Sequence, residues 1–198
     1  MNDFGKAFLG AALCALAACS GGGDGEAPEP PLAGASIGGD FELTGESGET
    51  VRESDFEGDY RLVYFGYTFC PDVCPVDMQK LGQGLRALEA SDPDLAARIQ
   101  PIFISVDPER DTPQILAEFT DNFHPRLLGL TGTPEQIDAA TEAYGVYSAT
   151  GDPNEAGGYL VDHTNNVTLF GPEGEPLALI PMDGTGEEIA AEIARWAS

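Results

Sequence analysis

Residues 62–75 read LVYFGYTFCPDVCP, a run of strand-forming side chains that stops at two cysteines separated by three residues. After Pro75, apolar residues recur at the spacing of one helix face. The pattern predicts a strand, a short loop and a helix with Pro75 in its first turn, where a missing N–H group costs nothing. Cys70 and Cys74 would then stand at or just before a helix N-terminus, whose partial positive charge favours thiolate over thiol.

The sequence on both sides of this stretch alternates between strand and helix patterns. An N-terminal β-hairpin is expected from the alternating residues 40–44, the turn at 45–48 and the return at 50–52. Strands are expected at residues 61–67, 100–106, 126–130, 146–148, 159–162, 166–170 and 177–181, and helices at residues 75–90, 113–123, 134–144 and 187–196. The continuous apolar run 100–106 is typical of a strand buried on both faces. A dithiol between strand and helix in this order predicts an α/β, thioredoxin-like fold with a mixed central sheet flanked by helices.

The N-terminus has the pattern of a targeting segment. Lys6 precedes an apolar run that ends in Leu-Ala-Ala before Cys19, similar to a bacterial lipobox, in which the cysteine is lipidated and becomes the new N-terminus. The run of about 12 residues is too short to span a bilayer. We therefore expect a lipoprotein signal peptide at 1–18, a flexible acidic, Gly- and Pro-containing tether at 19–36, and one domain at 37–198. The alternative is an ordinary cleaved signal peptide that leaves Cys19 free.

The cysteine count narrows the thiol chemistry to one pair. The sequence holds four cysteines, of which Cys14 lies within the expected leader and Cys19 is the expected lipid attachment site. Cys70 and Cys74 then remain for thiol chemistry in an oxidising compartment. Two sulfurs at this separation can hold one soft metal ion or close a disulfide, and the spacing alone leaves both open.

The composition excludes one class of partner. The 198 residues include 9 Lys and Arg against 34 Asp and Glu, a net charge of −25. Nucleic acid is not an expected partner, because binding to phosphates requires clustered positive charge. The acidic surface is interpreted as a solvated coat, although it could also steer the protein toward a positively charged partner.

Four motifs belong together: YFGYTFCPDVCP at 64–75, SVDPERDTP at 105–113, FHPR and GLTG within 123–132, and YLVDH at 159–163. With these motifs the chain resembles the Sco (SenC) family of copper chaperones for cytochrome c oxidase assembly. The resemblance covers about residues 37–197, in the family's order. This chain departs from the family in Thr164, where serine is usual, in the glycine-rich loop 151–158, and in the lipid anchor that replaces the more common transmembrane helix.

The resemblance implies a copper site formed by Cys70, Cys74 and His163. Copper(I) is a soft ion that prefers thiolate and imidazole, and the same donors also tolerate copper(II). Zinc fits less well, because a structural zinc site usually has four ligands. The resemblance further implies delivery of copper to the binuclear copper centre of cytochrome c oxidase subunit II, on the periplasmic side of a bacterial membrane. A periplasmic copper donor and a thiol reductant would be the other partners.

Several side chains are expected to support these ligands. We expect Asp72 to act as a helix cap or outer carboxylate, and Asp107 and Asp162 to orient His163 or nearby backbone, as carboxylates often do for a metal-binding imidazole. For Asp107, a role in a turn is an equal alternative. Tyr67 and Phe69 are expected to wall the site, whereas His124, in a His-Pro pair after a helix, is expected to be a capping or packing residue.

The chain is expected to be a metallochaperone rather than a catalyst. The main alternative is a thiol–disulfide oxidoreductase that uses Cys70 and Cys74 to reduce the copper-site cysteines of the same target. A structural disulfide between them and a single-nucleophile peroxidase are further alternatives. Copper loading requires the reduced pair, because bridged sulfurs cannot bind as thiolates.

Overall fold

The computed structural model describes residues 28–154 and 157–197. The expected signal peptide, the lipidation site Cys19 and the first part of the expected tether lie outside the described residues. The elements in chain order are β1 (Glu42–Gly45), β2 (Thr50–Arg52), the 3-10 helix η1 (Glu53–Phe56), β3 (Tyr60–Gly66), α1 (Val73–Ser91), α2 (Pro93–Ala97), β4 (Ile99–Ser105), α3 (Pro113–Thr120), β5 (Leu128–Thr131), α4 (Pro134–Ala143), β6 (Ser148–Thr150), β7 (Val161–His163), β8 (Val167–Phe170), β9 (Pro176–Ile180) and α5 (Gly186–Trp196).

The central sheet has seven strands in the order β2-β1-β5-β4-β3-β8-β9. Strands β3, β4 and β5 are parallel, with Tyr60 opposite Ile99 at one end of the β3–β4 pair and Gly66 opposite Ser105 at the other. The outer strands pair antiparallel, including the predicted β1–β2 hairpin. The expectation of a mixed sheet with an N-terminal hairpin is therefore confirmed.

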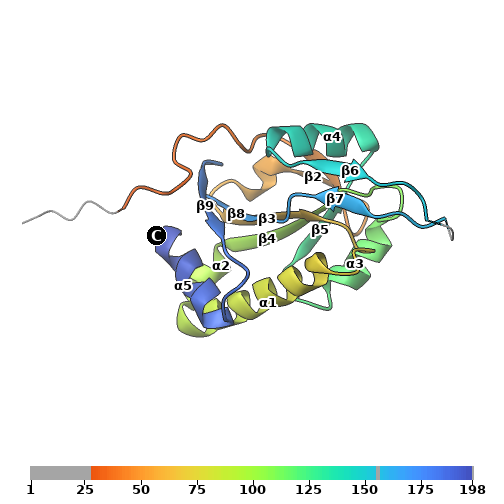
Figure 1. Cartoon of the computed structure of the whole chain (residues 1–198). Coiled ribbons are helices and arrows are strands. Elements are labelled where there is room, and N and C mark those ends of the chain that lie inside the picture. The colour runs from red at the N-terminus through yellow and green to blue at the C-terminus, as the bar shows by residue number, and fades with distance from the viewer. Residues whose placement is uncertain (1–27, 155–156, 198) are drawn as a thin grey trace, which may run out of the picture.

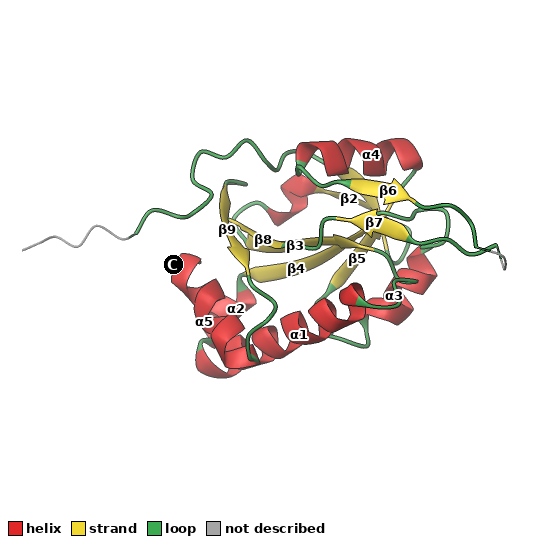
Figure 2. Ribbon diagram, in the orientation of Figure 1, coloured by secondary structure: helices red, strands yellow, loops and turns green. Residues whose placement is uncertain are grey.

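Helices cover both faces of this sheet. Helices α1, α2, α3 and α5 lie on one face, and α4 lies on the other (Figures 1 and 2). The β6–β7 hairpin lies beside α4 and forms a two-stranded sheet of its own. Among the described residues, no helix is both long and apolar enough to cross a membrane.

The core explains why the central strands have mostly apolar sequences. Every residue of β3 is buried, and in β4 only Gln100 is partly exposed. A strand covered on both faces has no solvated side, so alternation of polar and apolar residues disappears. The prediction of a doubly buried strand at 100–106 is confirmed.

The start of α1 and the end of α3 differ from their predicted positions. The helix begins at Val73, two residues before Pro75, which still lies in the first turn. Cys74 is thus inside the helix, whereas Cys70 precedes it. Helix α3 ends at Thr120 rather than at residue 123, and the chain continues in tighter turns, in which the N–H group of Phe123 donates to the carbonyl of Thr120 at 2.9 Å.

The end of the expected tether contacts the domain. The N–H group of Leu32 donates to the carbonyl of Leu177 at 3.0 Å. The described part of this segment is therefore held to the domain at Leu32 rather than free along its whole length.

Candidate metal centre

The two thiols lie where β3 gives way to α1. Cys70 is in the connecting loop with 9% of its surface exposed, and Cys74 is the second residue of the helix with none exposed. The backbone N–H group of Cys74 points at the Cys70 sulfur, 3.5 Å away. Both cysteines are free thiols. The strand–loop–helix arrangement predicted from residues 62–75 therefore brings the sulfurs together at one helix end.

His163 reaches this helix end from the last position of β7. Its Nε2 atom lies 3.2 Å from the Cys74 sulfur, and its Nδ1 atom lies 3.0 Å from the carbonyl oxygen of Thr164. Because a carbonyl oxygen only accepts, the second contact places a proton on Nδ1. The lone pair of a neutral ring is then on Nε2, the atom that faces the thiols. The backbone thus selects the tautomer that can bind a metal.

The three donor atoms form a compact group. The two sulfurs and a nitrogen of His163 lie within 4.8 Å of one another, although 89 residues separate Cys74 from His163. A d¹⁰ ion with bonds of about 2.0–2.3 Å, as found for zinc, requires ligands no more than roughly 4.6 Å apart. The donors therefore fit one soft ion after a small adjustment. In the part of the chain that is described, no other group of three or more Cys, His, Asp or Glu residues could hold a metal ion.

Aromatic rings enclose the imidazole. The Tyr67 ring lies 5.8 Å from the His163 ring and the Tyr64 ring 6.2 Å, both edge-to-face. A Cβ atom at Gly66 would lie 3.1 Å from the Cys74 sulfur and 2.7 Å from the Tyr64 ring, so glycine permits this close approach. Tyr67 walls the site as predicted, whereas the Phe69 side chain is half exposed.

The predicted preference for thiolate is wrong for Cys74. Burial raises the pKa of this thiol to about 12, and the neighbouring Cys70 adds to the effect, although a backbone hydrogen bond from Tyr67 acts against it. A helix N-terminus stabilises negative charge only modestly. Removing a thiolate from water costs more, so the desolvation of a side chain with no exposed surface outweighs the helix charge.

A buried tyrosine–aspartate pair beside the thiols was not predicted. The Tyr64 hydroxyl donates to the Asp77 carboxylate at 3.0 Å, and both side chains are buried. Burial raises the pKa of each group. The sequence did contain a signal, because Asp77 lies one turn after Cys74 on the face of α1 that carries Met78 and Leu81.

The expected carboxylates do not orient the imidazole. Asp162 is exposed, since it alternates with His163 along β7, and Asp72 occupies the N-cap position of α1 without a side-chain cap bond. Asp107 pairs with Arg110 and accepts a hydrogen bond from the Tyr159 hydroxyl at 2.8 Å. No hydrogen bond joins any of these three carboxylates to the His163 ring, so the expectation that Asp107 and Asp162 orient the imidazole directly is wrong. Asp107 instead contacts Tyr159, in the segment that leads to His163.

The turn interpretation of Asp107 is confirmed. Its backbone carbonyl accepts from the N–H groups of Arg110 at 3.2 Å and Asp111 at 2.9 Å. Asp107 is thus a turn residue whose side chain contacts Arg110 and Tyr159. The partner of the His163 Nδ1 atom is the carbonyl of Thr164.

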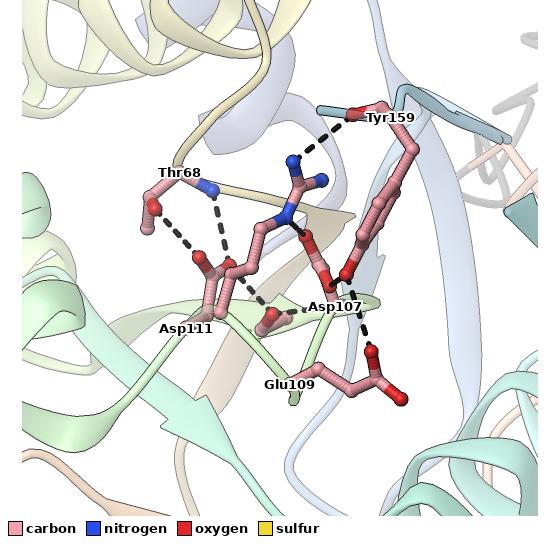
Figure 3. A network of polar contacts seen from close by, with 7 residues as sticks. Thr68, Asp107, Glu109, Asp111 and Tyr159 are labelled. Carbon is pink, nitrogen blue, oxygen red and sulfur yellow. Dashed lines mark hydrogen bonds and ion pairs between the residues drawn. The ribbon is translucent and has the colours of Figure 1, made fainter. Parts of the chain in front are cut away.

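A second carboxylate, Asp111, fixes the loop that leads to Cys70 (Figure 3). It is fully buried and accepts hydrogen bonds from the Thr68 N–H group at 3.0 Å, the Thr68 hydroxyl at 2.6 Å and the Ser105 hydroxyl at 2.6 Å. From the sequence, Asp111 or Thr112 could cap the helix that follows, and Thr112 is the actual N-cap of α3. The bonds to Thr68 connect residues 43 positions apart, which no local pattern could reveal.

His124 has the packing role that was predicted. It is buried, its Nδ1 atom accepts from the N–H group of Arg126 at 3.2 Å, and its Nε2 atom lies 3.4 Å from a carboxylate oxygen of Glu89. It does not belong to the metal-binding group.

Comparison with known proteins agrees with this geometry. The sequence profile of the SCO1/SenC family matches residues 29–198. Protein SenC of Rhodobacter capsulatus is 44% identical over 161 residues, which cover 81% of this chain and 71% of that protein. The human mitochondrial SCO1 homolog is 43% identical over 160 residues, which cover 80% of this chain and 52% of that protein. This chain therefore spans about half the length of that human relative.

Solved structures show the same fold, and several of them have copper bound. ScoI of Bradyrhizobium japonicum with copper bound superposes with a TM-score of 0.74 at 38% identity, covering 81% of this chain and 99% of the other. Yeast Sco1 with copper bound gives a TM-score of 0.73 at 35% identity, covering 80% and 87%. These likenesses confirm the expected thioredoxin-like architecture. With the profile match, they establish that the chain belongs to the SCO1/SenC family.

Proposed function

We propose that this protein binds copper as its cargo through the sulfurs of Cys70 and Cys74 and the Nε2 atom of His163. One observation carries the proposal: three soft or borderline donors from distant parts of the chain lie within 4.8 Å of one another. Related structures at 35% and 38% identity, described as having copper bound, support the choice of metal.

The chemistry of the donors favours copper(I) over other ions. Thiolate and imidazole are preferred by copper(I), whereas carboxylates and water suit harder ions. A structural zinc site usually has a fourth ligand, and the group formed by the described residues has three. Three donors leave one side of the ion open to an incoming ligand. Transfer of copper to a partner protein by ligand exchange requires such an open side. The same set can also hold copper(II).

The target in this proposal is the binuclear copper centre of cytochrome c oxidase subunit II, as the family resemblance implies. The protein would act on the periplasmic side of a bacterial membrane, held there by lipid on Cys19. A periplasmic copper donor would load it, and a thiol reductant would keep Cys70 and Cys74 reduced. The domain would extend over residues 37–198 behind a tether at 19–36.

The alternative, reduction of the target's cysteines, uses the same pair without His163. Thiol–disulfide exchange proceeds through the thiolate, and burial raises the pKa of Cys74 to about 12. Cys74 would therefore not be the attacking thiol at neutral pH, and the attack would fall to Cys70. His163 would have no part in the exchange, so its Nε2 atom, 3.2 Å from the Cys74 sulfur, is the observation that favours copper binding over reductase activity.

The test is an anaerobic copper(I) titration of the reduced protein against a chromophoric chelator. We expect one copper per chain, and no stoichiometric copper in Cys70→Ser or Cys74→Ser after desalting. His163→Ala should weaken binding by about 100-fold or more, because losing a ligand costs at least as much as changing a residue that supports one. Asp162→Asn is the matched control, since this neighbour in β7 is exposed on the other face, and its affinity should be unchanged.

Two results would count against the proposal. Near-normal affinity in His163→Ala would remove His163 from the ligand set. Stoichiometric copper in either serine variant would refute the site itself.

A different result would separate copper binding from thiol–disulfide exchange. In that case His163→Ala would lose copper binding but retain disulfide exchange.

A further inference from the structure

Arg110 lies between the segment that carries the cysteines and the segment that carries His163. Its guanidinium carbon is 3.7 Å from the centre of the Tyr159 ring, 5.1 Å from that of Phe69 and 5.6 Å from that of Tyr67. Tyr67 and Phe69 belong to the loop before Cys70. One planar cation therefore contacts aromatic rings from both sides of the site.

Arg110 is also held by hydrogen bonds at both ends. Its Nε atom pairs with the Asp107 carboxylate, and its Nη1 atom donates to the backbone carbonyl of Tyr159 at 3.0 Å. The Tyr159 hydroxyl donates to the other oxygen of the Asp107 carboxylate at 2.8 Å. Figure 3 shows this closed ring of contacts beside Asp111. The turn of residues 107–111 is thus connected to Tyr159 through both backbone and side chain.

The β6–β7 hairpin, which carries His163, has few other attachments to the central sheet. Among the strands that the structure describes, β6 and β7 pair only with each other and are not bonded into the seven-stranded sheet. At the base of the hairpin, Tyr147 and Thr164 exchange backbone and hydroxyl hydrogen bonds. At its outer part, Tyr159 is fixed to Asp107 and Arg110, four residues before His163. These two attachments act together with the buried side chain of Val161 and with the Tyr64 and Tyr67 rings beside the imidazole. The attachment at Tyr159 is the one that connects the outer part of the hairpin to the turn of residues 107–111.

The other side of the turn is fixed to the cysteine loop. Asp111 accepts two hydrogen bonds from Thr68, two residues before Cys70. The turn thus contacts both ligand-bearing segments, through Asp111 on one side and Arg110 on the other. A rigid connection of this kind can set the distance between the sulfurs and the ring.

We propose that Arg110 is a positioning residue that holds the β6–β7 hairpin over the thiols and thereby keeps His163 within reach of the metal. The inference rests on the proposed function, because it concerns how the third ligand is presented. Arginine suits this task, since its guanidinium stacks on rings and donates in several directions at once. Lysine would keep the charge beside Asp107 but lose the stacking and the second hydrogen bond.

The first test needs no copper. Amide hydrogen exchange of the reduced, copper-free protein is compared between wild type, Arg110→Met and Arg110→Lys. We expect exchange of the β6–β7 amides to accelerate at least about tenfold in Arg110→Met, and to a similar extent in Arg110→Lys, while the β3–β4 amides stay protected. Unchanged exchange in the hairpin would overturn the proposal. Accelerated exchange throughout the sheet would also contradict it, because that result indicates general destabilisation.

The second test is a double-mutant cycle on copper(I) affinity. Arg110→Met should weaken binding by about 10-fold or more, the range seen when residues that support metal ligands are changed. In a His163→Ala background, the same substitution should have no further effect, because the group that it positions is gone. An equal loss in both backgrounds would overturn the proposal.

Arg98→Met is the matched control. The Arg98 guanidinium also stacks on an aromatic ring, with its carbon 5.0 Å from the centre of the Tyr60 ring. Arg98 directly follows α2 and lies away from the site. We expect this variant to leave both hairpin exchange and copper affinity unchanged. If wild type fails to bind copper, the proposed function fails, whereas the exchange experiment still decides whether Arg110 holds the hairpin.

Discussion

Cys74 is the residue at which two physical effects compete. It lies in the first turn of α1, where the helix charge favours a thiolate, yet its side chain has no exposed surface. Burial prevails and raises the pKa of the thiol to about 12. The copper-free protein therefore keeps this thiol protonated at neutral pH, and a bound metal must displace the proton.

This proton makes copper binding dependent on pH. Because proton release accompanies binding, a lower proton concentration favours the bound state. We expect the copper(I) affinity to rise by about tenfold per pH unit between about pH 6 and pH 8 for each proton released, with at least one released by Cys74. Competition titrations at three pH values, corrected for the titration of the chelator alone, measure the slope. A flat profile would mean that Cys74 is already a thiolate in the copper-free protein.

The tautomer of His163 is also set at a single residue. The carbonyl of Thr164 accepts from Nδ1, so Nε2 remains available to a metal without any carboxylate partner. This contact uses the backbone of the next residue and does not depend on the side chain at position 164. The replacement of the family's usual serine by Thr164 therefore leaves this contact intact.

Helix α1 supports the thiols, and its close packing against neighbouring segments depends on two glycines. The helix packs along α5 on one face of the sheet (Figure 1). A Cβ atom at Gly84 would lie 2.4 Å from the Cγ2 atom of Ile189 in α5, and one at Gly82 would lie 2.6 Å from the carbonyl oxygen of Phe123. Two glycines in the middle of a helix lower its intrinsic stability. Here they allow close packing that larger side chains would prevent.

We expect Gly84→Ala to destabilise the protein by up to about 2 kcal/mol. Alanine improves helix propensity by about 1 kcal/mol, but overpacking a tight contact commonly costs about 1–3 kcal/mol and displaces α5. Urea denaturation of the reduced, copper-free protein measures the free energy of unfolding. Gln79→Ala, at an exposed position of the same helix, should change it by less than about 0.5 kcal/mol. A more stable Gly84→Ala variant would show that α1 and α5 can separate at no cost.

The whole chain combines a strongly acidic domain with an expected lipid anchor. Its net charge is −25. Charge of this size affects encounter with partners through long-range fields that salt screens. In the proposed setting the domain would meet its partners close to the membrane, so the anchor and the charge would act together on the rate of encounter.

The anchor is tested in cells. We expect Cys19→Ala to move the protein from the membrane fraction to the soluble fraction, because no other lipidation site is predicted. Cys14→Ala is the control, since this residue is expected to leave with the signal peptide and its loss should not change fractionation. Immunoblots of separated fractions give the readout. A membrane-bound Cys19→Ala variant would exclude the lipid anchor.

Local sequence patterns predicted most of the architecture. Periodicity, prolines and turn residues act over a few positions, so they placed the strands, most helix starts and the dithiol at the β3–α1 junction. The resemblance to the Sco family added His163, which no local pattern connects with Cys70 and Cys74. Where patterns are weak, as in the short strand β6, the prediction was displaced by two residues.

Other features depended on contacts that only the folded chain makes. Desolvation of Cys74 results from packing against β3, and the Tyr64–Asp77 pair joins a strand to a helix. The side chain of Asp107 turned to Arg110 and Tyr159, which lies 52 residues away, rather than to His163. Sequence patterns carry information on polarity and local geometry, whereas burial and hydrogen-bond choice are decided by which distant segments are brought together.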